Sequence, residues 1–166
     1  PAPIAAALER TARLGHFGYP HKPPAYYEAM QGFYARHFGW GIERGWISHN
    51  VGIYPSMRPL IDQLSAPGDE VIWQPPVHFQ FRNIVAAAGR VPVANPLALR
   101  DGRYEFDFDQ LAACVTPRTR LLLLCNPHNP VGRVWTPAEL RRLADFCHAR
   151  GIVVVADEVY CGLTYE

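Results

Sequence analysis

Polar residues that could take part in binding or catalysis follow two apolar segments near the C-terminal end of this sequence. Asn129 lies in Asn-Pro-His-Asn-Pro-Val-Gly at 126–132, and Asp157 and Tyr160 lie in Asp-Glu-Val-Tyr at 157–160. A carboxylate at the rim of an apolar core is costly unless a positive charge or hydrogen-bond donors face it. Asp157 therefore indicates either a binding site for a cationic group or a structural ion pair or helix cap, and the residues alone leave both open.

Three further residues have two interpretations each. Gly52, in Asn-Val-Gly-Ile at 50–53, precedes an expected helix, where free backbone N–H groups and the helix dipole favour a phosphate. The same pattern also occurs in ordinary turns. Asn129 could bind a ligand or brace a Pro-rich turn, and Tyr160 could face a site or be a half-buried packing residue.

Other kinds of site are not supported. The sequence has no G-x-G-x-x-G after an expected strand, no G-x-x-x-x-G-K-[ST] and no G-x-S-x-G, which argues against dinucleotide, P-loop and serine hydrolase sites. Cys125 and His128 form the only close Cys/His pair on an expected loop. Two ligands do not make a zinc site, so we expect no metal.

The elements that must position these residues form a β-α-β unit. Residues 120–125 and 152–156 predict strands, and Thr136 with Glu139 is a capping box that starts a helix ending near residue 150. Gly151 then ends this helix. In a parallel sheet ligands bind beyond the carboxyl ends of the strands, where residues 129, 157 and 160 would meet. We predict an α/β fold with a mainly parallel sheet covered by helices in three layers.

The pattern upstream predicts shorter elements. Helices are expected at 26–38, 54–64, 79–88 and 109–115, and strands at 46–48, 71–73 and 90–94. The strand at 152–156 is expected to be buried on both faces, like that at 120–125.

Composition narrows the class of protein. The chain has 166 residues, 49% of them apolar, and a formal net charge of +1, so we expect neither a nucleic-acid nor a membrane partner. Four Cys without a C-x-x-C predict reduced, buried thiols and a cytoplasmic protein. Both ends are abrupt, and we expect a fragment of a longer protein.

Taken together, these segments resemble fold-type I pyridoxal 5′-phosphate (PLP) enzymes of the aspartate aminotransferase superfamily. The similarity covers most of the chain and is most specific in the two motifs at 126–132 and 157–160. Gly-Ile-Tyr-Pro-Ser-Met at 52–57, Trp-Gln-Pro-Pro-Val at 73–77 and the stretch 124–135 favour the cystathionine β-lyase-like (MalY/PatB-type) branch.

The resemblance implies a role for each candidate residue around the cofactor PLP. Asp157 would pair with the pyridinium nitrogen and keep the ring protonated. Asn129 and Tyr160 would donate hydrogen bonds to the phenolic oxygen, and Gly52 and Ile53 would offer backbone N–H groups to the phosphate.

Two aromatic positions are also implicated by the resemblance. His78 stands where the family usually stacks Tyr, Phe or Trp on the cofactor ring, and the alternative is that Phe79 provides this packing. Tyr19, in Gly-Tyr-Pro, resembles a tyrosine that reaches the phosphate in the neighbouring subunit, which implies a homodimer. The alternative for Tyr19 is a tyrosine in a surface turn.

The implied activity is a PLP-dependent C–S β-lyase that cleaves a sulfur-containing amino acid to a thiol, pyruvate and ammonia. An aminotransferase is the alternative, because Tyr160 is more usual there and lyases often carry His. A second alternative is a catalytically inert PLP-fold binding or regulatory protein, since the only lysine is Lys22. The Schiff-base lysine is expected beyond Glu166, so no residue of this chain is predicted as the catalytic group.

The resemblance also suggests a division into domains. Residues 1–45 would be an N-terminal helical segment leading into the large domain. Residues 46–166 would be part of the PLP-binding large domain, with the rest of that domain and the small domain missing.

Overall fold

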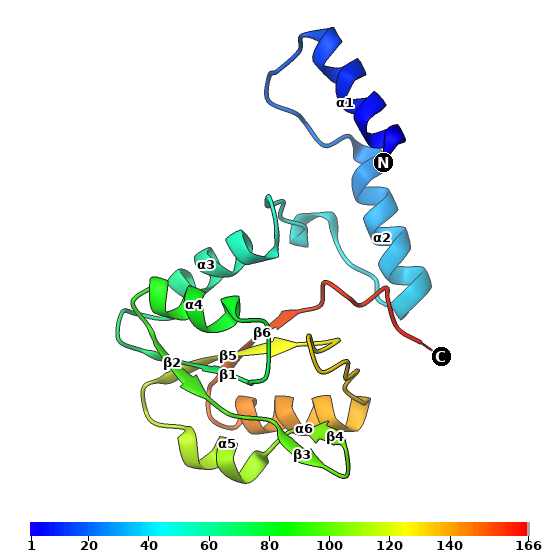
Figure 1. The fold of residues 1–166 in the computed structure, drawn as a ribbon. Helices are drawn as coiled ribbons and strands as arrows, with labels where there is room; N and C mark the ends of the chain where they lie inside the picture. Colours follow the sequence, from blue (N-terminus) through cyan, green and yellow to red (C-terminus); the bar gives the residue numbers. More distant parts are fainter. Residues whose placement is uncertain (166) are drawn as a thin grey trace. The chain divides into compact units, whose positions relative to one another are not determined.

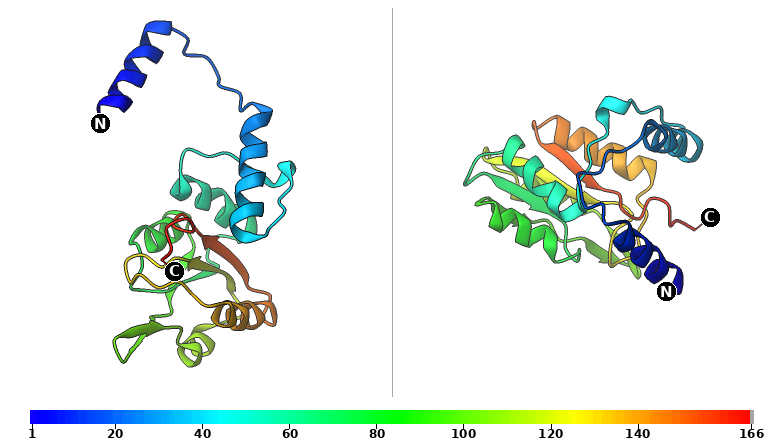
Figure 2. Two further views of the ribbon diagram at one scale, coloured as in Figure 1. Left: turned by 90° about the vertical axis from the view of Figure 1, so that its right-hand side faces the viewer. Right: turned by 90° about the horizontal axis from the view of Figure 1, so that it is seen from above.

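A computed structural model describes residues 1–165, which include a four-stranded parallel sheet (Figures 1 and 2). The strand order is β2-β1-β5-β6, with every neighbouring pair parallel. Their bounds are β1 Glu70–Trp73, β2 Val91–Ala94, β5 Thr119–Cys125 and β6 Val153–Asp157. The register pairs Cys125 with Asp157, so the carboxyl ends of β5 and β6 lie side by side.

Helices cover both faces of this sheet. In Figure 1, α3 (Ile53–Leu64) and α4 (Gln80–Ala87) lie above it, and α5 (Phe108–Cys114) and α6 (Pro137–His148) lie below. Successive residues of β5 therefore enter different cores. Leu123 packs with α3 and α4, whereas Leu122 packs with α5 and α6. This confirms the predicted three-layer α/β fold and explains why β5 is apolar from Leu121 to Cys125.

The prediction that the strand after α6 is buried on both faces holds only in part, because Val155 and Val154 pack into cores on opposite faces while other residues of the strand are exposed. Val153 of β6 is 45% exposed, whereas Val155 is buried in the core beneath α3 and α4. Among the described residues β6 pairs only with β5 and stands at one end of the strand order. Its burial therefore differs from that of β5, which has a strand on each side.

The β5-α6-β6 unit has the predicted local signals. The Thr136 hydroxyl accepts a hydrogen bond from the Glu139 N–H at 3.2 Å, and the Glu139 carboxylate accepts one from the Thr136 N–H at 2.7 Å. Gly151 adopts φ 66°, a left-handed conformation that glycine tolerates best. The capping box and the glycine stop are thus confirmed, and the last helical residue is His148.

Two short segments differ from expectation. Residues 46–48 do not form a strand, because the 3₁₀ helix η1 (Arg44–Trp46) occupies the beginning of this segment. The antiparallel hairpin of β3 (Ala98–Arg100) and β4 (Arg103–Glu105) was not expected. Asp101 and Gly102 connect it with φ 49° and 75°, the positive values that a tight two-residue hairpin turn requires.

The chain divides into two compact units, Pro1–His49 and Asn50–Glu166. The first contains α1 (Ala2–Leu14), whose bounds were not predicted, together with α2 (Pro24–Phe38) and η1. None of the three has a buried residue. Within residues 1–165 the helices fall short of the length and hydrophobicity that crossing a bilayer requires.

Candidate functional site

A cavity of about 190 Å³ lies at the carboxyl ends of β5 and β6. Its walls come from the first turns of α3 and α4, the loop after β5 and the segment after β6. The lining residues are Ile53, Tyr54, Met57, His78, Gln80, Phe81, Cys125, Asn129, Asp157, Val159 and Tyr160. Five of the seven residues singled out from the sequence are among them, drawn from four separate segments.

Asp157 is the last residue of β6 and lines this cavity. Oδ1 accepts a hydrogen bond from the Val159 N–H at 3.1 Å. Burial raises the pKa of the Asp157 carboxyl, while His78 acts in the opposite direction. In the described part of the chain no ion pair involves Asp157, so the structural ion pair that the sequence left open is not found.

Asn129 is held in place by its backbone. Its N–H donates to the Cys125 sulfur at 3.4 Å, and its carbonyl oxygen accepts from the His78 N–H at 3.0 Å. Both backbone groups are thus engaged inside the protein while the residue lines the cavity. The backbone bonds agree with the interpretation as a loop brace, and the binding role of the Asn129 side chain stays a prediction.

Tyr160 lies three residues beyond Asp157 and is partly exposed at the same cavity. Tyr160 and Asn129 also line a second, more open hollow of about 250 Å³ formed with the loop after β5 and residues 163–165. These two residues thus stand at the boundary between both spaces, where a hydroxyl and an amide are available to a ligand.

The N-terminus of α3 borders the cavity through Ile53 and Tyr54. Gly52 precedes the helix but is not itself a lining residue; its carbonyl accepts hydrogen bonds from the Ser56 N–H and hydroxyl. The first N–H groups of a helix have no partner within it, and the helix dipole makes this end attractive to an anion.

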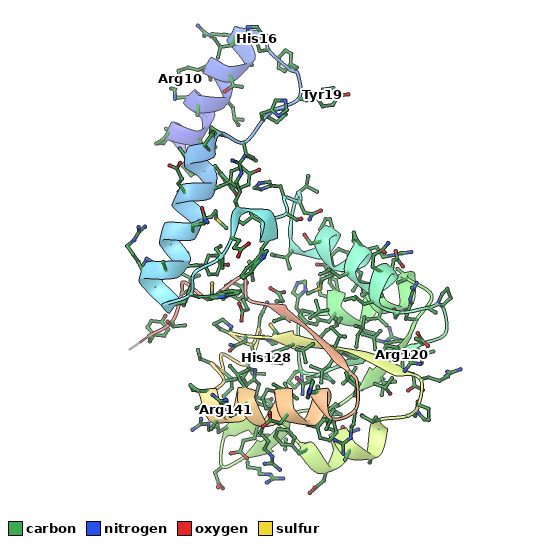
Figure 3. All side chains as sticks on the ribbon, turned by 180° about the vertical axis from the view of Figure 1, so that it is seen from behind. Arg10, His16, Tyr19, Arg120, His128 and Arg141 are labelled. Carbon is green, nitrogen blue, oxygen red and sulfur yellow. The ribbon has the colours of Figure 1, made fainter. Side chains whose placement is uncertain are left out.

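His78, rather than Phe79, lines the cavity. The two rings are in contact, with centroids 4.7 Å apart, but Phe79 is 65% exposed and is not part of the wall. Tyr19 belongs to the other unit, between α1 and α2, and is 99% exposed; Figure 3 shows its side chain projecting from this loop. Its role stays a prediction.

Sequence reasoning missed the apolar floor of the cavity. Met57 and Phe81 face it from α3 and α4, and Cys125 faces it from the end of β5. Burial raises the pKa of the Cys125 thiol, which is therefore neutral at pH 7. For Met57 the sequence did hold a signal, because residues 53 and 57 are four apart and lie on the same face of a helix.

The described residues contain no group of three or more His, Cys, Asp or Glu side chains that could hold a metal ion. The lining of the cavity is a mixture of polar and apolar groups. It combines an acid, a helix N-terminus, an imidazole, an amide and a phenol over an apolar floor.

Comparison with known proteins identifies the family. The family model for class I and II aminotransferases matches residues 53–166, which include both diagnostic motifs. The chain belongs to this family. Its matched region contains every residue that lines the cavity.

Members of the family similar to this chain have different activities. Cystathionine beta-lyase PatB of Bacillus subtilis is 34% identical over 98% of this chain, and aspartate aminotransferase of Geobacillus stearothermophilus is 32% identical over 99%. The PLP-bound C–S lyase structure from Staphylococcus hominis has a TM-score of 0.85 at 26% identity, covering 95% of this chain and 41% of its own. The chain spans 42% of the length of the first two relatives.

Proposed function

We propose that this chain supplies part of the PLP-binding domain of an enzyme that acts on an amino acid. The observation that carries the proposal is the cavity that collects His78, Asn129, Asp157 and Tyr160 beside the N-terminus of α3. Membership of the class I and II aminotransferase family supports it.

The donor set fits the chemistry of this cofactor. When bound, PLP supplies a pyridinium ring that withdraws electrons from the α-carbon of an amino acid. Asp157 is a carboxylate whose pKa is raised by burial, so a cationic N–H beside it would stabilise the charged form. The N-terminus of α3 suits the phosphate, for which Gly52 and Ile53 would provide backbone N–H groups.

The remaining residues would hold the ring in place. Asn129 and Tyr160 would donate hydrogen bonds to the phenolic oxygen, which favours its anionic form. His78 would lie against the ring face. The apolar floor formed by Met57 and Phe81 would exclude water from this part of the site.

For the reaction we propose C–S β-lysis of a sulfur-containing amino acid. With cystathionine, one water is consumed and homocysteine, pyruvate and ammonia are released. The supporting observations are the similarity to PatB and to the Staphylococcus hominis C–S lyase. The group that removes the α-proton is not assigned to a residue of this chain.

Transamination is the second candidate, and Tyr160 favours it. The motif at 157–160 ends in Tyr, which is more usual in aminotransferases than in lyases, and the aspartate aminotransferase relative is nearly as similar as PatB. In this reaction the amino group would pass to a 2-oxo acid, so no pyruvate would be released from cystathionine.

The intact protein distinguishes these reactions in two assays. One measures pyruvate and free thiol from cystathionine without any oxo acid. The other measures amino-group transfer from an amino acid to 2-oxoglutarate. Pyruvate and thiol in equal amounts support the lyase, and transfer alone supports the aminotransferase. A protein that binds PLP but does neither would support a binding or regulatory role and overturn both proposed reactions.

We further propose that the enzyme is a homodimer in which Tyr19 of one subunit serves the cofactor of the other. Its support is the resemblance of Gly-Tyr-Pro at 18–20 and the full exposure of this side chain. Sedimentation equilibrium tests the assembly, and weaker PLP binding by Tyr19→Phe would test the contact. A monomer with full PLP affinity would contradict it.

A further inference from the structure

His128 is the most buried titratable side chain near the candidate site, with 1% of its surface exposed. It lies on the α6 side of the sheet, as Figure 3 shows, and does not line the main cavity. Its Nε2 is 3.1 Å from the carbonyl oxygen of Pro76. Because a carbonyl oxygen only accepts, Nε2 carries the hydrogen and donates it.

This hydrogen bond joins the two segments that carry polar walls of the cavity. His128 directly precedes Asn129, and Pro76 lies two residues before His78. A second bond runs the opposite way, from the His78 N–H to the Asn129 carbonyl oxygen at 3.0 Å. The loop after β5 and the segment after β1 are therefore connected twice within a few residues.

The imidazole is itself held in one orientation. The ring of Trp135 lies perpendicular to it, with centroids 5.6 Å apart, and the indole N–H donates to the Cys125 carbonyl oxygen at 3.0 Å. The backbone of His128 donates to the Arg133 carbonyl oxygen at 2.7 Å and accepts from Gly132 N–H at 2.9 Å. The ring contact and the bond to Pro76 hold the side chain, and the backbone bonds hold the chain at His128, so this residue can transmit position to the one next to it.

We propose that His128 is a positioning residue, whose buried imidazole fastens the loop bearing Asn129 to the segment bearing His78 and so sets the spacing of these two walls of the cofactor pocket. The identity of the molecule that the pocket binds rests on the proposed function. The hydrogen bond from His128 to Pro76, which we call the clasp, is a contact within this chain and does not depend on that identity.

Burial supports the neutral form of this clasp. It lowers the pKa of His128, so the ring is uncharged at pH 7. A neutral Nε2–H donor can be replaced by an amide, since Gln places its nitrogen at a similar distance from Cα. Phe keeps the ring volume and the edge contact with Trp135 but cannot donate to Pro76.

The experiment compares His128→Phe and His128→Gln in the intact protein. Thr119→Val is the matched control: Thr119 is buried, donates to Glu70 at 2.9 Å, and begins β5 at the end opposite the cavity. The first readout, without added PLP, is hydrogen exchange of the His78 amide. The second is the pH midpoint of the absorbance change of bound PLP, which reports the surroundings of its phenolic oxygen.

His128→Phe should speed exchange of the His78 amide about five- to tenfold, as expected for one lost hydrogen bond, and shift the absorbance midpoint. His128→Gln should restore both readouts, and Thr119→Val should change neither. Unchanged exchange in His128→Phe, or an equal change in Thr119→Val, would overturn the clasp. If the wild-type protein binds no PLP, the proposed function is refuted. The clasp is then tested by hydrogen exchange of the His78 amide alone, which needs no PLP.

Discussion

At the scale of single residues, the site depends on a carboxylate that forms no ion pair within residues 1–165. Asp157 is half-buried, its pKa is raised by that burial, and His78 only partly offsets the effect. The pKa of the neighbouring Glu158 is also raised, first by burial and then by the negative charge of Asp157. A protonated ring nitrogen would relieve this cost, which is the physical reason for placing PLP here.

A pH dependence of stability is expected from His128. Because its folded pKa is lowered, the unfolded chain binds a proton more readily once the pH falls below about 6.5, and stability drops. The raised pKa values of Asp157 and Glu158 act in the opposite direction, but they are common to wild type and variant.

The difference in unfolding free energy between wild type and His128→Phe should therefore shrink from pH 7 to pH 5. Urea denaturation across this range measures it. A difference that stays constant would show that His128 is protonated equally in both states.

At the scale of elements, α6 connects β5 and β6, two paired parallel strands whose carboxyl ends carry the site. Its start is fixed by the reciprocal bonds between Thr136 and Glu139, and the Glu139 carboxylate also pairs with Arg133 of the preceding loop. The capping box therefore ties the helix to the loop that bears Asn129.

Thr136→Ala should lower the unfolding free energy by about 1 kcal/mol, the usual cost of losing such a cap. Thr136→Ser keeps the hydroxyl and should stay close to wild type. Chemical denaturation of the two variants gives the comparison. Equal losses in both variants would mean that packing of the threonine methyl, and not the cap, stabilises the helix start.

The elements that were predictable carry their signals locally. The apolar run of β5 and the box at Thr136 need no knowledge of the rest of the chain. The exposure of Val153 could not be predicted, because it depends on which strands pair with β6. The β3-β4 hairpin was missed because three-residue strands are too short to show a period.

The candidate site, too, was predicted only in part. Motifs at the ends of β5 and β6 located Asn129, Asp157 and Tyr160, because parallel strands bring these ends together. The sequence could not reveal that Cys125 anchors Asn129, or that His128 reaches Pro76, 52 residues earlier. Such contacts arise only from the packing of distant loops.

At the scale of the whole molecule, the unit that begins at Asn50 is a sheet with a core on each face. Neighbouring residues of β5 pack into different cores, and the candidate cavity borders the core beneath α3 and α4, from which Met57, Phe81 and Cys125 line it. A rigid central strand thus positions the start of the loop that follows it.

Both cores should contribute comparably to stability. Leu122→Ala and Leu123→Ala should each cost about 2–5 kcal/mol, because both side chains are fully buried on opposite faces of the sheet. Leu99→Ala, at a leucine that is 60% exposed, should stay within about 0.5 kcal/mol of wild type. Denaturant unfolding measures all three. A negligible loss for either buried leucine would contradict the three-layer packing.

The most direct test of the central claim is the protonation of the PLP ring nitrogen in the intact protein. With ¹⁵N-labelled PLP, the ring-nitrogen chemical shift distinguishes a protonated from an unprotonated ring. We expect a protonated nitrogen in the wild type at pH 8 and an unprotonated one in Asp157→Asn, which keeps the shape of the side chain but not its charge. The same protonation state in both proteins would contradict the assignment of Asp157 as the partner of the cofactor ring.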